Sequence, residues 1–168
     1  MTSLVIRGAT VKDIKSIVRV RLAGLTEEEI RGFSAPEWVL FDSTKKLQQA
    51  WDRENILKDG FEVFVVEDEG EIIGYIVFKI IDYYGYIENI VIAKKKQLKG
   101  IGRALVTHVE CIVKSKGYYL MKTDTTENAE GTPWKAYGFW IKLGYHDTGE
   151  RLPTQWNFKT IPFIKRLK

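Results

Sequence analysis

The sequence contains little that would support disulfide bonds, metal binding or membrane insertion. Its 168 residues include one cysteine, Cys111, and two histidines, His108 and His146. A single cysteine excludes an internal disulfide framework and a zinc site built on cysteines. The two histidines lie far apart in sequence and have no ligand-like spacing, so no metal is expected. No apolar run approaches the length that crosses a bilayer, and the first residues lack a signal-peptide core. We therefore expect a cytoplasmic protein without a membrane partner.

The charge of the chain is only a mild basic excess. The formal net charge is +4 and the sequence pI is about 9.0. Cationic residues gather at 94–103 and at the C-terminal end of the chain. This balance does not favour a nucleic-acid-binding protein, although the lysines keep a basic nucleic-acid-binding module as an alternative. Cys111 has apolar neighbours in a predicted helix and is expected to be a small core residue.

The pattern of apolar residues predicts one domain, residues 1–168, in which helices cover both faces of a central sheet. The expected strands are Leu4–Arg7, Phe61–Glu67, Ile72–Ile81, Tyr86–Ile92, Tyr118–Thr125, Tyr145–Glu150 and Gln155–Lys165. The expected helices begin at Thr10, at Ser43 or Thr44, at Gly100 and at Thr132–Pro133, and end near Gly24, Lys58, Lys116 and Gly144. The predicted fold class is α/β, with a central mixed, mostly antiparallel, twisted sheet of about six or seven strands flanked by about four helices.

Turn and breaker residues indicate how these strands connect. The acidic segment EDEGE at 67–71 and the segment DYYG at 82–85 suit tight turns, which predicts an antiparallel meander from Phe61 to Ile92. A helix separates the strand at 86–92 from the strand at 118–125, so those two are expected to run parallel. Pro162 is expected to limit the last strand to an edge position or to break it.

The stretch from Tyr86 to Lys116 combines a strand, a basic loop with two glycines and a long helix. Gln97, Gly100 and Gly102 form the pattern Q-x-x-G-x-G at the entry to the helix. Free N–H groups at a helix N-terminus attract anions, and glycines let a ligand approach the backbone closely. The five cationic side chains nearby suit a ligand with several phosphates, and they are Lys94, Lys95, Lys96, Lys99 and Arg103.

Two other nucleotide-binding patterns fit this loop poorly. The dinucleotide-binding fingerprint requires a third small residue where this chain has Leu105, and it requires a parallel βαβ unit at the start of a domain. The P-loop requires Gly-Lys followed by Ser or Thr, which the loop lacks.

The segment IENIVIAKKKQLKGIGRAL resembles the signature of the GNAT superfamily of acetyl-CoA-dependent N-acetyltransferases, which is a strand, then R/Q-x-x-G-x-G/A, then a helix. A second segment, 139–145 (FWIKLGY), resembles the F-Y-x-K-x-G-F motif of the same family with aromatic changes. The order of strands and helices agrees across nearly the whole chain. The resemblance implies a GNAT-like fold and a transferase that uses acetyl-CoA as cosubstrate.

The resemblance also implies where acetyl-CoA binds. Its pantetheine arm is expected along the strand at 90–92, and its pyrophosphate at backbone amides of 98–103. Asn128 resembles a family asparagine that contacts the cofactor, with a turn residue as the alternative. The residues expected at the cofactor are Ile90, Val91, Ile92, Gln97, Leu98, Lys99, Gly100, Ile101, Gly102, Arg103 and Asn128.

Transfer of an acetyl group to an amine requires that the amine lose a proton, and Glu88 is the candidate base because it lies on the strand that would hold the thioester. The alternative interpretation is that Glu88 is a charged residue on the strand that only faces solvent. A backbone N–H near Ile90 or Val91 is expected to stabilise the oxyanion. The position that resembles the family's proton-donating tyrosine is Trp140, so Tyr137, three residues earlier on the helix, is the candidate acid, with packing as its alternative.

The acceptor is expected to be a primary amine of a small molecule or of a protein, and a homodimer stays open. Segment 25–43 and the turn at Tyr83 and Tyr84 are expected to select it. The acidic run 27–29 would attract a cation or be a solvated helix face, and Trp38 would line the site. A catalytically weak sensor of CoA or acetyl-CoA is the alternative to an enzyme, because of Trp140.

Overall fold

The structure is a computed structural model and describes residues 4–23, 60–154 and 157–168, without the side chain of Leu22. The predicted helix at 43–58 and the predicted acceptor segment 25–43 lie outside the described residues. The strands are β1 (Leu4–Gly8), β2 (Phe61–Asp68), β3 (Glu71–Ile81), β4 (Tyr84–Ile92), β5 (Leu120–Asn128), β6 (His146–Asp147), β7 (Leu152–Pro153) and β8 (Phe158–Arg166). The helices are η1 (Val11–Asp13), α1 (Ile14–Ala23), η3 (Lys94–Lys96), α5 (Ile101–Ser115) and α6 (Ala136–Lys142), of which η1 and η3 are short 3₁₀ turns.

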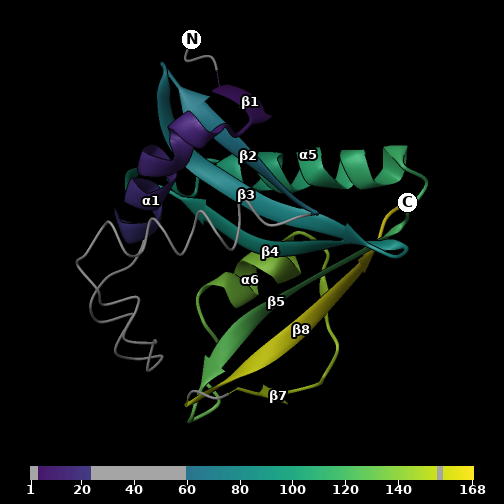
Figure 1. Cartoon of the computed structure of the whole chain (residues 1–168). Helices are drawn as coiled ribbons and strands as arrows, with labels where there is room; N and C mark the ends of the chain where they lie inside the picture. The colour runs from purple at the N-terminus through teal and green to yellow at the C-terminus, as the bar shows by residue number, and fades with distance from the viewer. Residues whose placement is uncertain (1–3, 24–59, 155–156) are drawn as a thin grey trace.

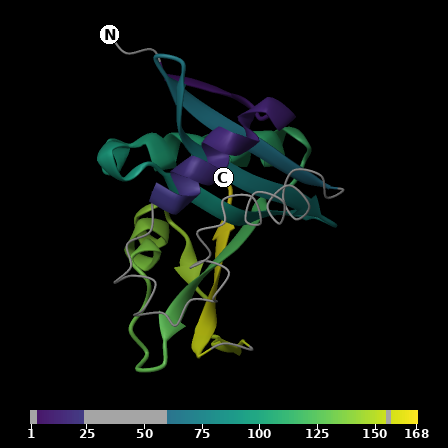
Figure 2. The ribbon, with the colours of Figure 1, turned by 60° about the vertical axis from the view of Figure 1, so that its left-hand side comes forward.

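The strands form one 8-stranded mixed sheet in the order β1-β2-β3-β4-β5-β8-β6, with β7 also paired to β8. The pairing of β4 with β5 is parallel, as predicted from the helix between them, and the other pairs are antiparallel. Figure 1 shows that β5 and β8 extend away from the layer formed by β1 to β4, and the rotated view in Figure 2 shows the same division. The predicted α/β class and mixed sheet are confirmed, with one strand more than expected.

Two apolar layers hold the helices on opposite faces of the sheet. One layer lies between the sheet and α1, and includes Ile17, Tyr75 and Val77. The other lies under α5 and α6 and includes Leu105 and Trp140. From Tyr75 to Phe78 of β3, adjacent residues alternate between these layers, because successive side chains of a strand point to opposite faces. Both faces of the central strands are therefore buried.

The two hairpins of the meander are tight, as their turn residues predict. Glu69 and Gly70 both have positive φ angles, 52° and 82°, which is the geometry of a two-residue turn that matches strand twist. Asp82 also has a positive φ angle of 50°. The second turn comprises only residues 82 and 83, because β4 begins at Tyr84, so the turn predicted over 82–85 was too long.

The start predicted for the last helix was wrong. Thr132 and Pro133 do not cap α6, which begins at Ala136. Pro133 forms an isolated bridge with Glu127, and the N–H of Trp134 donates to the Thr126 carbonyl at 2.7 Å. The segment therefore extends the edge of β5 before it becomes helical. The end of the helix agrees with the prediction, since Gly144 follows it with a φ angle of 84°.

Cys111 is exposed, so its prediction as a core residue was wrong. The buried face of α5 contains Val109 and Val113, and Cys111 lies two positions from each, about 200° around the helix. Pro162 neither breaks β8 nor places it at an edge, because β8 lies between β5 and β6. The Pro162 carbonyl accepts the Thr148 N–H at 3.1 Å, so the side on which proline lacks a donor faces away from β5.

Candidate active site

The site is built where β4 and β5 separate. These strands pair only at Gly85 with Met121 and at Tyr86 with Lys122. The hydroxyl of Thr123 then donates to the Ile87 carbonyl at 3.0 Å. Beyond that point no pairing joins β4 to β5 in the part of the chain that the structure describes, and β5 continues along β8 instead. The parting of the two strands leaves one edge of β4 open.

A β-bulge lies at the same point of β4. On the β3 side, Ile87 pairs with Phe78 and Asn89 pairs with Val77, so Glu88 is the extra residue. A bulge bends its strand and increases the local twist, which is consistent with the separation of β4 from β5. Glu88 is exposed at this bend. The prediction placed it on the strand of the site, and the structure adds that it interrupts the ladder there.

The backbone direction along β4 follows from two hydrogen bonds. Ala93 N–H donates to the Ile73 carbonyl at 2.8 Å, so Ala93 faces β3. The Gln97 side-chain amide donates to the Ile92 carbonyl at 2.9 Å from the other side. Because adjacent residues of a strand alternate, the polar backbone groups of Ile90 and Ile92 face the open edge and those of Val91 face β3.

The loop before α5 contains two residues with left-handed backbones, Leu98 with a φ angle of 63° and Gly100 with 78°. Gly100 is the N-cap of α5, and the first N–H groups of a helix have no partner within the helix. Gly102 serves a different purpose: a Cβ atom there would lie 3.1 Å from the Phe139 ring on α6. The second glycine of the motif therefore lets α5 pack closely against α6.

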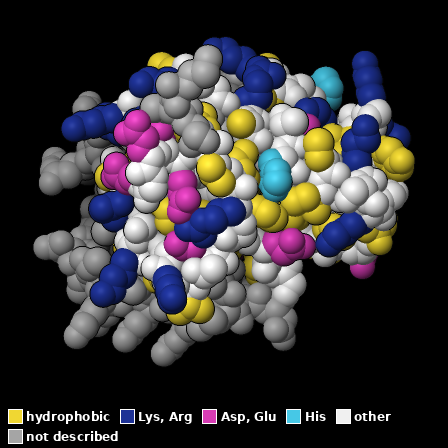
Figure 3. Space-filling view, turned by 90° about the horizontal axis from the view of Figure 1, so that it is seen from above, with side chains coloured by type: hydrophobic (Ala, Val, Ile, Leu, Met, Phe, Trp, Pro, Cys, Tyr) yellow, Lys and Arg dark blue, Asp and Glu magenta, His cyan; other side chains and the backbone are white. Residues whose placement is uncertain are grey.

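The cationic cluster predicted around this loop is smaller than expected. Lys96 forms an ion pair with Asp68 at 2.7 Å, and this hydrogen bond raises the pKa of Lys96. Arg103 donates to the Lys142 carbonyl at 3.4 Å. Three lysines remain exposed, which are Lys94, Lys95 and Lys99. On the face seen in Figure 3, lysine and arginine side chains are dispersed among acidic and apolar ones and form no continuous basic patch.

Tyr86 and Asp124 meet at the base of the separation. The Tyr86 hydroxyl donates to the Asp124 carboxylate, which joins the last paired residue of β4 to a residue of β5 two positions beyond the pairing. Burial is the main cause that raises the pKa of each group, and the tyrosine hydrogen bond partly offsets it for Asp124. Glu88 also raises the pKa of Tyr86 through its charge, so it lies in the same electrostatic environment. This pair was not predicted from the sequence, where a charged residue within the strand at 118–125 was the available signal.

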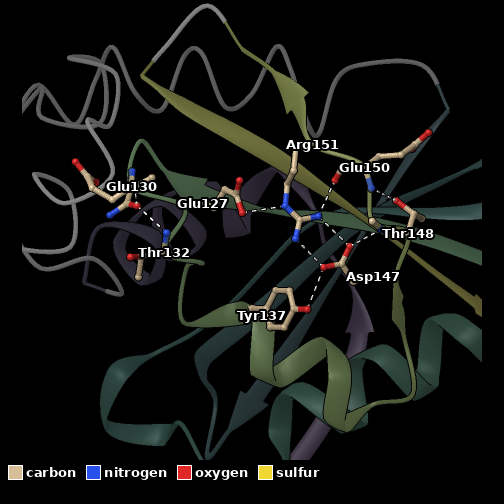
Figure 4. Close-up of polar contacts among 10 residues, drawn as sticks. Glu127, Glu130, Thr132, Tyr137, Asp147, Thr148, Glu150 and Arg151 are labelled. Carbon is tan, nitrogen blue, oxygen red and sulfur yellow. Dashed lines mark hydrogen bonds and ion pairs between the residues drawn. The ribbon is translucent and has the colours of Figure 1, made fainter.

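Tyr137 belongs to a second polar cluster on the far side of β5, shown in Figure 4. Its hydroxyl donates to Asp147 at 3.0 Å, and this bond is the main cause that raises the pKa of Tyr137. Arg151 bridges Asp147, at 2.9 Å, and the buried Glu127, at 2.9 Å. Trp140 is buried in the core beside Phe139 and Tyr145.

Asn128 lies at the end of β5, and its Oδ1 accepts N–H groups of Glu130 at 3.1 Å and Thr132 at 2.8 Å. These bonds stabilise the loop that follows, as expected for the turn alternative. Its contact with a cofactor stays a prediction. Across the described ranges, no group of three or more histidine, cysteine or acidic residues is arranged to hold a metal, and no helix has the length and apolarity to span a membrane.

Known proteins match this chain in sequence pattern and in fold. The sequence model of the acetyltransferase (GNAT) family matches residues 25–145. A PaiA N-acetyltransferase from Thermoplasma acidophilum, solved with coenzyme A, is 18% identical with a TM-score of 0.70, and the match covers 98% of this chain and 99% of that one. An aminoglycoside 6′-N-acetyltransferase complexed with coenzyme A is 17% identical with a TM-score of 0.69, covering 96% of each chain. The ribosomal-protein-S18-alanine N-acetyltransferase from Escherichia coli is 16% identical with a TM-score of 0.65, covering 99% of this chain and 95% of that one.

A search of curated protein sequences finds no significant match. The family match spans most of the chain, and the solved structures share its fold. The chain belongs to the GNAT acetyltransferase family.

Proposed function

We propose that this protein is an N-acetyltransferase that transfers the acetyl group of acetyl-CoA to a primary amine, of a small molecule or of a protein, by direct attack in a ternary complex. The observation that supports it most is the open edge of β4, which leads from the bulge at Glu88 to the N-terminus of α5. An extended ligand with a phosphorylated end suits such a path, since the edge offers backbone groups and the helix offers N–H groups.

Acetyl-CoA would be held mainly by backbone. Ile90 presents an N–H and a carbonyl to the open edge, and Ile92 presents its N–H, because Gln97 occupies the Ile92 carbonyl. Val91 would contribute through its side chain, since its backbone faces β3. The amides of residues 98–103 would bind the pyrophosphate, and exposed Lys99 would add a charge. Gln97 would shape this cradle through its bond to Ile92, and Gly102 would let α5 pack closely beside it in addition to offering its amide.

The proposed chemistry assigns a separate task to each group at the bend. Acetyl-CoA, when bound, supplies a thioester carbonyl to be attacked and a thiol to be released. Glu88 would accept a proton from the amine, directly or through water. The Ile90 N–H would donate to the carbonyl oxygen as negative charge develops on it. Tyr137 is the candidate acid from the sequence, but its hydroxyl donates a hydrogen bond to Asp147, which makes it a poor proton donor to the thiolate. A thiol has a modest pKa of about 8.5, so the thiolate can leave without a dedicated acid.

The function is tested by measuring release of free CoA thiol with purified protein, acetyl-CoA and a panel of primary amines. Thiol release that requires both substrates is expected, with an acetylated amine found by mass spectrometry. Glu88→Gln should lower kcat by about 100-fold and abolish its rise with pH, because a base of this kind contributes about 10²- to 10⁴-fold. Glu150→Gln is the matched control, since Glu150 is an exposed carboxylate outside the site. An unchanged pH profile in Glu88→Gln would remove the base assignment.

A sensor of CoA or acetyl-CoA is the second candidate. Two observations favour it: Trp140 replaces the family's tyrosine, and the Tyr137 hydroxyl is engaged by Asp147. Tight binding of acetyl-CoA without thiol release for any amine of the panel would favour the sensor. A cytoplasmic location and a homodimer stay predictions from the sequence.

A further inference from the structure

Asp124 differs from the other partly or fully buried carboxylates of the structure in having no cationic partner. Asp13 pairs with Arg7, Asp68 with Lys96, Glu110 with Lys165, and Glu127 and Asp147 with Arg151. Within residues 4–23, 60–154 and 157–168, no lysine or arginine forms an ion pair with Asp124. Its partner there is the neutral hydroxyl of Tyr86.

The nearest cation along β5 is directed elsewhere. Lys122 lies two residues before Asp124, on the same face of the strand, and its ammonium group lies 4.1 Å from the centre of the Tyr84 ring. The Lys122 ammonium group is therefore engaged by a cation–π contact with Tyr84 of β4 and does not pair with Asp124. The opposite face of β5 at this point is buried through Met121, Thr123 and Thr125. Asp124 therefore lies on the α1 face of the sheet, at the base of the β4–β5 separation.

A desolvated carboxylate without a cation is costly, so a buried one normally has a charged partner. The cost appears here as the raised pKa of Asp124. Tyr86 holds one carboxylate oxygen in place and supplies no charge. The structure thus preorganises an anionic group at the point where the acceptor would enter and leaves its countercharge to be supplied by a ligand.

We propose that Asp124, held in place by Tyr86, binds the ammonium group of the acceptor, so that this protein selects amines that arrive as cations. This inference rests on the proposed function and names the substrate class of the same site. It also separates the tasks of two carboxylates: Asp124 binds the ammonium group and exposed Glu88 passes a proton to solvent.

The proton balance of the reaction agrees with this division. An alkylammonium group loses two protons when it becomes an amide. The nitrogen–carbon bond forms and the carbon–sulfur bond breaks, one nitrogen proton ends on the released thiol, and the other leaves through Glu88 to water. Binding the charged form at Asp124 requires no additional reactant.

Benzylamine and aniline provide a matched pair of probes, because they have similar rings but benzylamine is a cation at neutral pH and aniline is neutral. For the wild-type protein we expect thiol release with benzylamine at a kcat/KM at least about tenfold above that with aniline. In Asp124→Asn, KM for benzylamine should rise at least about tenfold with kcat within about threefold, while KM for acetyl-CoA stays unchanged. Glu150→Gln, which removes one exposed negative charge, should leave both amines unaffected. Equal KM values for benzylamine in wild type and Asp124→Asn would overturn the proposal.

A second measurement reads binding without turnover. In protein with ¹³C-labelled aspartate, the Asp124 carboxyl resonance, assigned by its loss in Asp124→Asn, should shift on titration with benzylamine and not with benzyl alcohol. Tyr86→Phe should weaken this binding about threefold, since it frees the carboxylate to move. A missing shift at saturating benzylamine would overturn the inference. A shift without thiol release would instead support the binding site and count against the proposed enzyme.

Discussion

Asp147 offers the sharpest test of what stabilises β5, the strand that faces β4 across the candidate site. Its carboxylate accepts hydrogen bonds from Arg151 at 3.0 and 2.9 Å, from the Tyr137 hydroxyl at 3.0 Å and from the Gly149 N–H at 2.8 Å. The Arg151 bonds are the main cause that lowers the pKa of Asp147 from 3.8 to about 2. A shift of one pKa unit corresponds to about 1.4 kcal/mol, so the lowered pKa of Asp147 contributes about 2 kcal/mol to the folding free energy. The side chain is only 16% exposed, so solvent screening removes little of it.

The sign of the effect fixes its pH dependence. Because the folded-state pKa lies below the unfolded one, the stabilisation is complete above about pH 5 and declines as pH falls toward 2. We expect Asp147→Asn to lower the free energy of unfolding by about 2 kcal/mol at pH 7, measured by urea denaturation. At pH 3 the gap from wild type should be about half as large.

Glu150→Gln is the control for Asp147→Asn, because it removes a neighbouring exposed carboxylate and should change stability by less than about 0.5 kcal/mol. A gap between wild type and Asp147→Asn that is as large at pH 3 as at pH 7 would show that the loss is not electrostatic. A gap below about 0.5 kcal/mol at pH 7 would refute the assigned strength of the Arg151 contact.

Two further substitutions test the cofactor cradle and the candidate acid. Gly102→Val should weaken acetyl-CoA binding at least about tenfold in calorimetry and cost about 1–3 kcal/mol of stability, because its Cβ would lie 3.1 Å from Phe139. Gly138→Ala on α6 has open space and should bind normally, and equal affinities in both variants would refute the packing argument. Tyr137→Phe should lower kcat by less than about tenfold, since the Tyr137 proton is donated to Asp147, whereas a loss of about 100-fold or more would identify Tyr137 as the acid.

The parts of the fold that follow from local chemistry could be predicted from the sequence. Glu69 and Gly70 form the tight turn that their residue types favour, and the capping box of Thr10 and Asp13 is present at the start of the first helix. Gly100, the first glycine of Q-x-x-G-x-G, has the left-handed backbone that favours glycine. These features depend on neighbours within a few residues, which a sequence displays directly.

The features that define the site depend on contacts between distant segments. The bulge at Glu88 is a property of its register with β3, and the pattern of apolar residues in β4 gives no sign of it. The partner of Lys96 is Asp68 on another strand, so a lysine expected at a ligand instead anchors the loop. Asp124 becomes notable only when the other partly or fully buried carboxylates of the described residues have been paired with their cations. The sequence could therefore predict a cofactor cradle from one continuous motif, but it could not point to the proposed acceptor anchor, which depends on contacts between strands.

An open strand edge in the middle of a sheet requires that the strand on its far side be held by other contacts. β5 pairs with β8 along its whole length, from Leu120 to Asn128, while it pairs with β4 at only two positions. At its far end, Arg151 ties Glu127 of β5 to Asp147, and Asp147 in turn holds α6 through Tyr137. These contacts fix β5 without using the edge that faces β4. Weakening the Arg151 cluster should therefore loosen the wall that carries Asp124 and leave the α5 cradle intact, so Asp147→Asn is expected to affect KM for the amine more than KM for acetyl-CoA.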